Sequence, residues 1–242
     1  MTKYIFVIST GRCGTTYLSK IFENCVDVDS FHENYPVCNE KEMYVFQKGN
    51  ADSMRKLVVQ KVKQIKSKNK KLIYSETNHC FIKGFGWFVR DHINPKDIGV
   101  IILKRDMDSV VKSYSKRINN PFSYMARKWL LSTNKKLVMN DPPSIIHRKF
   151  DIIFYHLGKF LPKAFFRFLF FIANDYTKKY FEWYYKETYD MAKEFQKKNT
   201  DMKFYECNLE DLNNYENVLY LLEYYNIRPK KSLKKIINKP IN

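Results

Sequence analysis

The sequence predicts an α/β fold with a central, mainly parallel β-sheet covered by helices. Short apolar runs rich in β-branched and aromatic residues alternate along the chain with segments of helical periodicity, an order typical of parallel sheets. Residues 97–104 are nearly all apolar, as expected for a strand buried on both faces. The 242 residues are 45% hydrophobic, and no repeat or Pro/Gly-rich linker divides them. We therefore expect a single domain over residues 1–242.

Periodicity and turn signals place the individual elements. Strands are expected at residues 3–9, 28–31, 71–76, 97–104 and 202–207. Helices are expected at residues 15–24, 51–67, 105–117, 174–198 and 215–225, with a further helix around Trp129. The stretch from about residue 119 to 173 predicts an inserted helical lid, and the basic tail 230–242 is expected to fray.

The formal net charge of +18 predicts an anionic partner: nucleic acid, an anionic lipid surface, or a phosphorylated or sulfated small molecule. A genome rich in A and T would also favour the abundant Lys, Asn, Tyr and Ile. The five cysteines are widely spaced and form no C-x-x-C pair, which favours a reducing, cytoplasmic compartment over a disulfide scaffold or a zinc site. Basic residues interrupt the longest apolar region, residues 154–173, so we expect no membrane-spanning helix; contact with a membrane surface stays open.

A glycine-containing turn between the first strand and the first helix is the sharpest signal in the sequence. Backbone N–H groups of such a turn, together with the helix N-terminus, form a cradle for an anion. Glycine lets the backbone approach a phosphate closely, and threonine hydroxyls can donate further hydrogen bonds. The residues expected to bind the phosphate are Gly11, Arg12, Cys13, Gly14, Thr15 and Thr16.

This turn is related to the Walker A pattern G-x-x-x-x-G-K-[ST] but departs from it at one position. Thr15 stands where that pattern has the lysine that contacts the β- and γ-phosphates. No clear Asp partner for Mg²⁺ is present either. We therefore expect a three-layer, P-loop-NTPase-like fold with a helical insertion, whose loop binds a phosphate without the chemistry of Mg-ATP.

The segment T-G-R-C-G-T-T after a strand resembles the 5′-phosphosulfate-binding loop of sulfotransferases that use 3′-phosphoadenylyl sulfate (PAPS). Arg12 falls where that family has its basic residue. A second resemblance follows the strand at 97–104, where Arg105 and Ser113 match the family's 3′-phosphate motif. A strand-end guanidinium and a hydroxyl about two helical turns later can share one phosphate. The alternative is that Arg105 pairs with Asp108 and has only a structural role.

The resemblance covers about the first 120 residues and a short later segment, residues 206–214, similar to the E-D-L segment of Golgi-type and bacterial sulfotransferases. The R-K-G triplet of the cytosolic small-molecule branch is missing, which points towards the carbohydrate-type or bacterial branch. The resemblance implies PAPS as donor and the desulfated bisphosphate, PAP, as product, with no metal. It also implies a glycan or glycolipid acceptor, for which the lid at about 119–173 is the expected binding segment.

An acceptor hydroxyl or amine must lose a proton, so a general base is expected. His32 and Glu33 follow the second strand, and in the family a Glu or His from this region commonly serves. Adjacent residues of an extended segment point in opposite directions, so we expect only one of them, Glu33 by a small margin, to face the acceptor. Arg12 is expected to stabilise the leaving phosphate.

Three further polar residues follow the strand at 71–76 and are candidates for acceptor binding or acid/base chemistry: Glu76, Asn78 and His79. The carboxyl end of that strand should lie at the same sheet edge as the phosphate loop.

Two other classes of function stay open. A nucleotide or nucleoside kinase would share the phosphate loop, although Thr15 at the lysine position disfavours it. A non-enzymatic basic module that binds nucleic acid or membranes is permitted by the charge, although the sequence has no RNP, KH or zinc-finger pattern.

Overall fold

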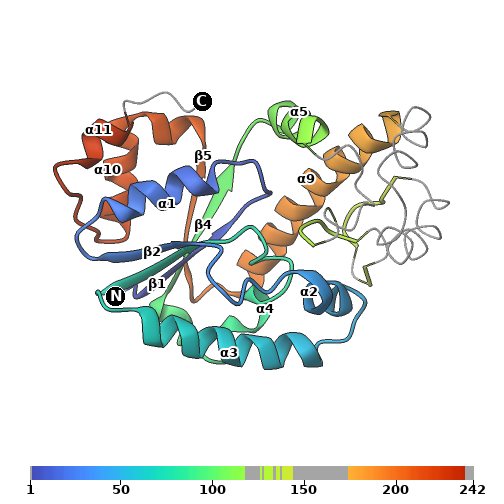
Figure 1. Ribbon diagram of the computed structural model, residues 1–242, viewed down its shortest axis with the longest axis horizontal. Helices are drawn as coiled ribbons and strands as arrows, with labels where there is room; N and C mark the ends of the chain where they lie inside the picture. Colours follow the sequence, from blue (N-terminus) through green and yellow to red (C-terminus); the bar gives the residue numbers. More distant parts are fainter. Residues whose placement is uncertain are drawn as a thin grey trace.

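The computed structural model contains one five-stranded parallel sheet in the order β2-β3-β1-β4-β5 (Figure 1). The strands are β1 (Tyr4–Ile8), β2 (Val28–His32), β3 (Ile73–Thr77), β4 (Ile98–Lys104) and β5 (Lys203–Asn208). The structure describes residues 2–117, 126, 128–132, 135–136, 138–143 and 174–237. The expected strands therefore all occur, and the sheet is parallel throughout.

The helices alternate with these strands, as the sequence predicts. They are α1 (Thr15–Glu23), α2 (Glu40–Gln47), α3 (Asp52–Lys68), α4 (Gly86–Val89), α5 (Met107–Arg117), α9 (Asn174–Lys198), α10 (Tyr215–Tyr224) and α11 (Leu233–Ile237). Two short 3₁₀ helices cover Pro95–Asp97 and Glu210–Asn213. Among the described residues, none of the helices is both long and apolar enough to cross a membrane.

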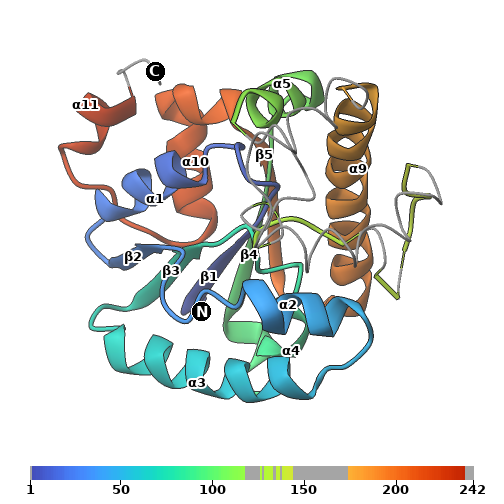
Figure 2. The same cartoon turned by 45° about the vertical axis from the view of Figure 1, so that its right-hand side comes forward.

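Side chains that alternate along β1 divide the core into two layers, one on each face of the sheet. Ile5 and Val7 pack in the cluster that includes residues of α1, α10 and α11. Phe6 and Ile8 pack in the cluster that includes residues of α3, α4, α5 and α9. Figures 1 and 2 show these two helix groups on opposite faces of the sheet. The result is the three-layer α/β architecture that the period-2 alternation of a buried strand produces.

The chain order places a ligand-binding edge between β1 and β4. From β1 the chain moves to β2 and β3 on one side, and it then returns to β4 on the other side of β1. Such a reversal leaves a crevice at the carboxyl ends of the two central strands, where open α/β sheets bind ligands. The phosphate loop follows β1, and Arg105 follows β4.

Three local expectations are wrong or lie outside the described residues. The basic tail does not simply fray, because α11 buries Leu233 and Ile237 against the core. Trp129 itself lies in a turn, and its N–H donates to the carbonyl oxygen of Ala126; Ala126 is helical, and the neighbouring residues 118–125 and 127 lie outside the described residues. Most of the expected lid, including residues 144–173, lies outside the described residues.

Candidate functional site

The loop between β1 and α1 has the backbone conformation of an anion cradle. Arg12 has a φ of 69° and Gly14 a φ of 85°, so the chain turns through the left-handed region twice before α1 begins at Thr15. No side chain caps the N-terminus of α1, and its first turn carries no acidic residue. The first N–H groups of α1 therefore lack a side-chain acceptor, and the positive end of the helix is left for a bound anion.

Both loop glycines lie in close contact with side chains from elsewhere in the chain. A Cβ built on Gly11 would lie 2.3 Å from the Tyr114 hydroxyl oxygen, and one built on Gly14 would lie 2.3 Å from Leu209 Cδ1. The sequence suggested close approach to a phosphate, and the structure adds that a Cβ at either position would force Tyr114 or Leu209 to shift, while the φ of 85° at Gly14 itself favours glycine. Leu209 belongs to the segment 206–214, so that segment supports the phosphate loop.

The two predicted anion motifs meet in space. Arg12 Nε donates a hydrogen bond to Ser113 Oγ over 3.0 Å, although the two residues are 101 positions apart. Arg105 donates to the carbonyl oxygen of Arg12 over 3.1 Å. Asp106, not Arg105, caps α5 by accepting the Ser109 N–H at 2.8 Å. Arg105 therefore lies at the phosphate loop and does not serve as the cap of its own helix.

Glu33 and His79 form a hydrogen-bonded pair beside this loop. His79 Nδ1 lies 2.7 Å from Glu33 Oε1, and since a carboxylate only accepts, His79 donates from Nδ1. The Nε2 lone pair of a neutral His79 is then left for another proton. His79 Cδ2, the ring carbon next to Nε2, lies 3.6 Å from a Cβ built on Gly11, so this edge of the ring faces the phosphate loop.

His32 does not point away from Glu33, contrary to the expectation for an extended segment. Glu33 has a φ of 50°, which bends the chain, and His32 Nε2 lies 4.0 Å from Glu33 Oε1. His32 Nδ1 lies 3.0 Å from the Thr77 carbonyl oxygen, and its Nε2 lies 3.2 Å from Thr16 Oγ1. These contacts give His32 a position in which it orients the Thr16 hydroxyl at the start of α1.

The pair is unprotonated at neutral pH. Burial raises the pKa of Glu33, but the hydrogen bond from His79 and the nearby positive groups outweigh it, so the net pKa lies below the ordinary value. Burial, reinforced by the charge of Lys83, lowers the pKa of His79 to about 4. Glu33 is therefore a carboxylate and His79 a neutral imidazole near pH 7.

Glu76 and Asn78 are fully buried, and this burial argues against the acceptor-binding role that the sequence suggested for them. Glu76 Oε1 accepts hydrogen bonds from Lys61 at 2.7 Å and from Asn78 Nδ2 at 3.0 Å, and Tyr74 donates to Oε2 at 2.7 Å. Lys61 also donates to the carbonyl oxygen of Asn34, the residue after Glu33, at 2.5 Å. This network fixes the loop that carries Glu33 to β3 and α3.

Two neighbours of His79 were not singled out from the sequence. The Trp129 ring stacks on the His79 ring with a centroid distance of 5.3 Å and an interplanar angle of 29°. Lys83, four residues after His79, is fully buried and donates to the Trp129 carbonyl oxygen at 2.7 Å. No local pattern identifies either residue, because both contacts join segments about 50 positions apart.

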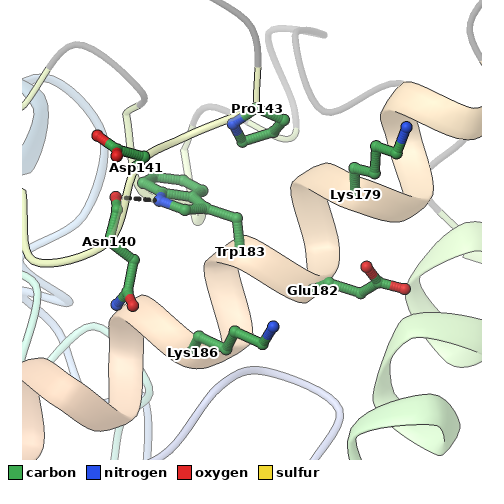
Figure 3. Close-up of a pocket in the computed structure, with 7 residues that line it drawn as sticks. All are labelled: Asn140, Asp141, Pro143, Lys179, Glu182, Trp183 and Lys186. Carbon is green, nitrogen blue, oxygen red and sulfur yellow. Dashed lines mark hydrogen bonds between the residues drawn. The ribbon is translucent and has the colours of Figure 1, made fainter.

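A polar pocket of about 340 Å³ lies on α9, beside residues 140–143 (Figure 3). It is lined by Asn140, Asp141, Pro143, Lys179, Glu182, Trp183 and Lys186. The Trp183 indole N–H donates to the Asn140 carbonyl oxygen at 2.9 Å, so the indole is held in the wall. Carboxylates, ammonium groups and an amide at its rim provide both donors and acceptors of hydrogen bonds.

Solved structures of sulfotransferases share this fold. A sulfotransferase from Alicyclobacillus acidocaldarius matches with a TM-score of 0.50 and 12% identity, over 100% of this chain and 87% of that chain. The sulfotransferase domain from the curacin biosynthetic pathway matches with a TM-score of 0.52 and 12% identity, over 99% of this chain and 79% of that domain. No protein-family model and no curated protein matches the chain. The likeness shows that the chain has the α/β fold of these sulfotransferases.

Proposed function

We propose that this chain is a sulfotransferase that moves a sulfuryl group from PAPS to a hydroxyl or amine of an acceptor. The observation that carries the proposal is the hydrogen bond between Arg12 and Ser113, which joins two anion motifs at the crevice between β1 and β4. One adenosine that carries phosphates on both its 3′ and 5′ positions needs two such motifs side by side. The fold shared with known sulfotransferases is consistent with it.

In this proposal the residues after β1 and β4 bind opposite ends of the donor. The cradle from Gly11 to Thr16, with the N-terminus of α1, takes the 5′-phosphosulfate, and Arg105 with Ser113 takes the 3′-phosphate. The donor supplies the activated sulfuryl group. Arg12 carries a fixed positive charge at the loop and stabilises negative charge that develops there during transfer.

The Glu33–His79 pair is the proposed base. His79 Nε2 accepts the proton of the acceptor, and Glu33 holds the imidazole through Nδ1 and stabilises its protonated form. His32 keeps the Thr16 hydroxyl in place at the cradle.

The acceptor is proposed to be rich in hydroxyl groups, such as a glycan or glycolipid. The pocket on α9 supports this class (Figure 3). Its interspersed carboxylate, amide and ammonium groups can form hydrogen bonds with many hydroxyls, and they suit such an acceptor better than an acceptor with one strong charge. The absent R-K-G triplet favours the carbohydrate-type or bacterial branch.

Adenosine 3′,5′-bisphosphate should stabilise the protein against heat more than AMP or ATP does. Both anion motifs hold the bisphosphate, whereas AMP fills one of them and ATP brings a triphosphate to a loop without the Walker lysine. A ligand at 100 times its dissociation constant adds about 2.7 kcal/mol to the free energy of unfolding. Thermal unfolding with each nucleotide, with and without Mg²⁺, measures the order. Preference for Mg-ATP would support a kinase instead.

Arg105→Ala should remove the preference for the bisphosphate over AMP. The guanidinium is the proposed fork for the 3′-phosphate, so its loss should lower the affinity for the bisphosphate about 10- to 100-fold. The affinity for AMP should change little. Titration of both nucleotides against the variant measures this, with Arg55→Ala on the exposed surface of α3 as the matched control. An unchanged preference would exclude the role given to Arg105.

A further inference from the structure

Three lysines are buried among the described residues, and one of them differs from the other two. Lys61 pairs with Glu76 and Lys135 pairs with Glu187, so each of these ammonium groups has a carboxylate partner. Lys83 is fully buried and forms no ion pair with any carboxylate of the described chain. A buried ammonium without a counter-ion is costly, and proteins rarely keep one without a use.

Lys83 comes from the turn that follows the carboxyl end of β3. Its Nζ donates to the Tyr184 hydroxyl at 2.5 Å and to the Trp129 carbonyl oxygen at 2.7 Å. The Nζ also lies 4.8 Å from the centroid of the Tyr184 ring. These neutral groups solvate the ammonium, and the Glu33 carboxylate acts on it through space without forming an ion pair with it.

The contacts of Lys83 lead directly to the phosphate loop. Tyr184 packs edge-on against Tyr114, with ring centroids 5.7 Å apart, and the two hydroxyls interact. The Tyr114 hydroxyl lies against Gly11, and Tyr184 also interacts with the Gly11 backbone. The Tyr184 side chain therefore lies between Lys83 and the loop that is proposed to bind the anion.

Burial lowers the pKa of Lys83 to about 8. Titratable groups of each element packed around it are Cys80 and His79 in its own turn, Glu33 after β2, Cys13 in the phosphate loop and Tyr184 on α9. Of these, Glu33 is the carboxylate, and it is held by His79. A further negative charge near Lys83 would raise its pKa again.

We propose that Lys83 is a buried electrostatic partner of the phosphate or phosphosulfate bound in the loop from Gly11 to Thr16. It is a positioning residue: it reaches the loop through Tyr184 and Tyr114, and its charge is compensated when the anion binds. The inference rests on the proposed function, since it needs an anionic ligand at this loop. The same charge holds the Trp129 backbone, so anion binding and the position of the ring on His79 are linked through one ammonium group.

Binding of adenosine 3′,5′-bisphosphate should then be accompanied by proton uptake. At pH 8 about half of the Lys83 side chains in the free protein are neutral, and the anion favours the ammonium form, so about half a proton should be taken up per ligand. Phosphate monoesters are fully ionised at pH 8, so the ligand itself contributes little. Calorimetric titration in two buffers of different ionisation enthalpy measures the uptake. At pH 7 the uptake should be much smaller, because Lys83 already carries its proton.

Two substitutions of Lys83 separate an electrostatic role towards the bound anion from a purely structural role. Lys83→Arg keeps a permanent charge, so it should bind the bisphosphate without proton uptake at pH 8. Lys83→Met should bind at least about tenfold more weakly, the factor that one unit of pKa shift represents, and should also lose the uptake. Lys63→Met, which removes an exposed lysine on α3, should retain both the affinity and the uptake of the unmodified protein. Circular dichroism checks that each variant folds. If Lys83→Met does not fold, the comparison of proton uptake between the unmodified protein and Lys83→Arg is the test.

The outcomes are distinct. Uptake in the unmodified protein that disappears in Lys83→Arg supports the inference. Binding without uptake, or equal uptake in Lys83→Arg, overturns it and leaves the proposed function standing. Failure of the unmodified protein to bind the bisphosphate overturns the proposed function and this inference with it.

Discussion

Glu33→Gln should lower kcat for sulfuryl transfer by about 10²- to 10⁴-fold, the range that general bases contribute. The amide cannot stabilise a protonated His79 as the carboxylate does, so the proton of the acceptor has no favourable destination. Affinity for the bisphosphate should change little, because in the proposed site the residues after β1 and β4 hold the donor. Turnover of PAPS with a panel of hydroxylated acceptors, together with bisphosphate titration, measures both quantities.

The pH dependence of this reaction follows from the same pair. The base must be unprotonated, and the pKa of Glu33 lies below its ordinary value while that of His79 is about 4. The rate should therefore be flat from about pH 6 to 8, as far as this pair governs it, and should fall as the pH drops towards 4.

Glu23→Gln, an exposed change of the same kind on α1, serves as the control for Glu33→Gln. Full activity of Glu33→Gln would place the base elsewhere.

Lys61→Met should destabilise the protein by about 3–5 kcal/mol, the cost typical of removing one partner of a buried ion pair. The change leaves the carboxylate of Glu76 buried without its ammonium partner, and it removes the donor to the Asn34 carbonyl oxygen. Urea unfolding of the free protein measures the loss. The loop that carries Glu33 should also lose its support, so turnover should fall even where the variant is folded.

A second substitution tests the cause of that loss. Lys61→Met combined with Glu76→Leu removes both charges and should recover a large part of the stability, since no unpaired carboxylate remains. Lys63→Met, two positions along α3 and exposed, should change the free energy of unfolding by no more than about 0.5 kcal/mol. A Lys61→Met variant as stable as the unmodified protein would show that the pair does not hold the loop.

Much of the fold could be predicted because its signals are local. The apolar run at 97–104 became β4, and the Met54, Val58 and Ile65 spacing became the buried face of α3. The prediction missed α2, a short polar helix in which apolar residues do not recur at a clear helical spacing. It also missed the burial at the tail, because Leu233 and Ile237 are too few to outweigh the surrounding lysines in a local reading.

The site residues divide in the same way. The resemblance to two sulfotransferase motifs predicts that Arg12 and Ser113 serve one nucleotide, and the structure places Arg12 Nε 3.0 Å from Ser113 Oγ. Glu76 was predicted to face the site from its place near a strand end, yet its side chain is buried with Lys61. A strand end fixes the edge at which a residue lies, but the packing of neighbouring elements decides where its side chain points.

The sequence by itself determined the order of strands and helices, because hydrophobic period and turn chemistry are properties of a few neighbouring residues, and its resemblance to sulfotransferases predicts the two anion motifs. Only the tertiary structure decided that Glu33 binds His79, that Trp129 stacks on His79, and that Lys83 stands behind the loop from Gly11 to Thr16 without an ion pair among the described residues. These contacts join segments about 45 to 100 positions apart, and their geometry depends on a left-handed φ at Glu33 and on burial in the core. Neither the backbone angle nor the burial can be derived from the residues on one side of a contact, since both follow from how the whole chain packs.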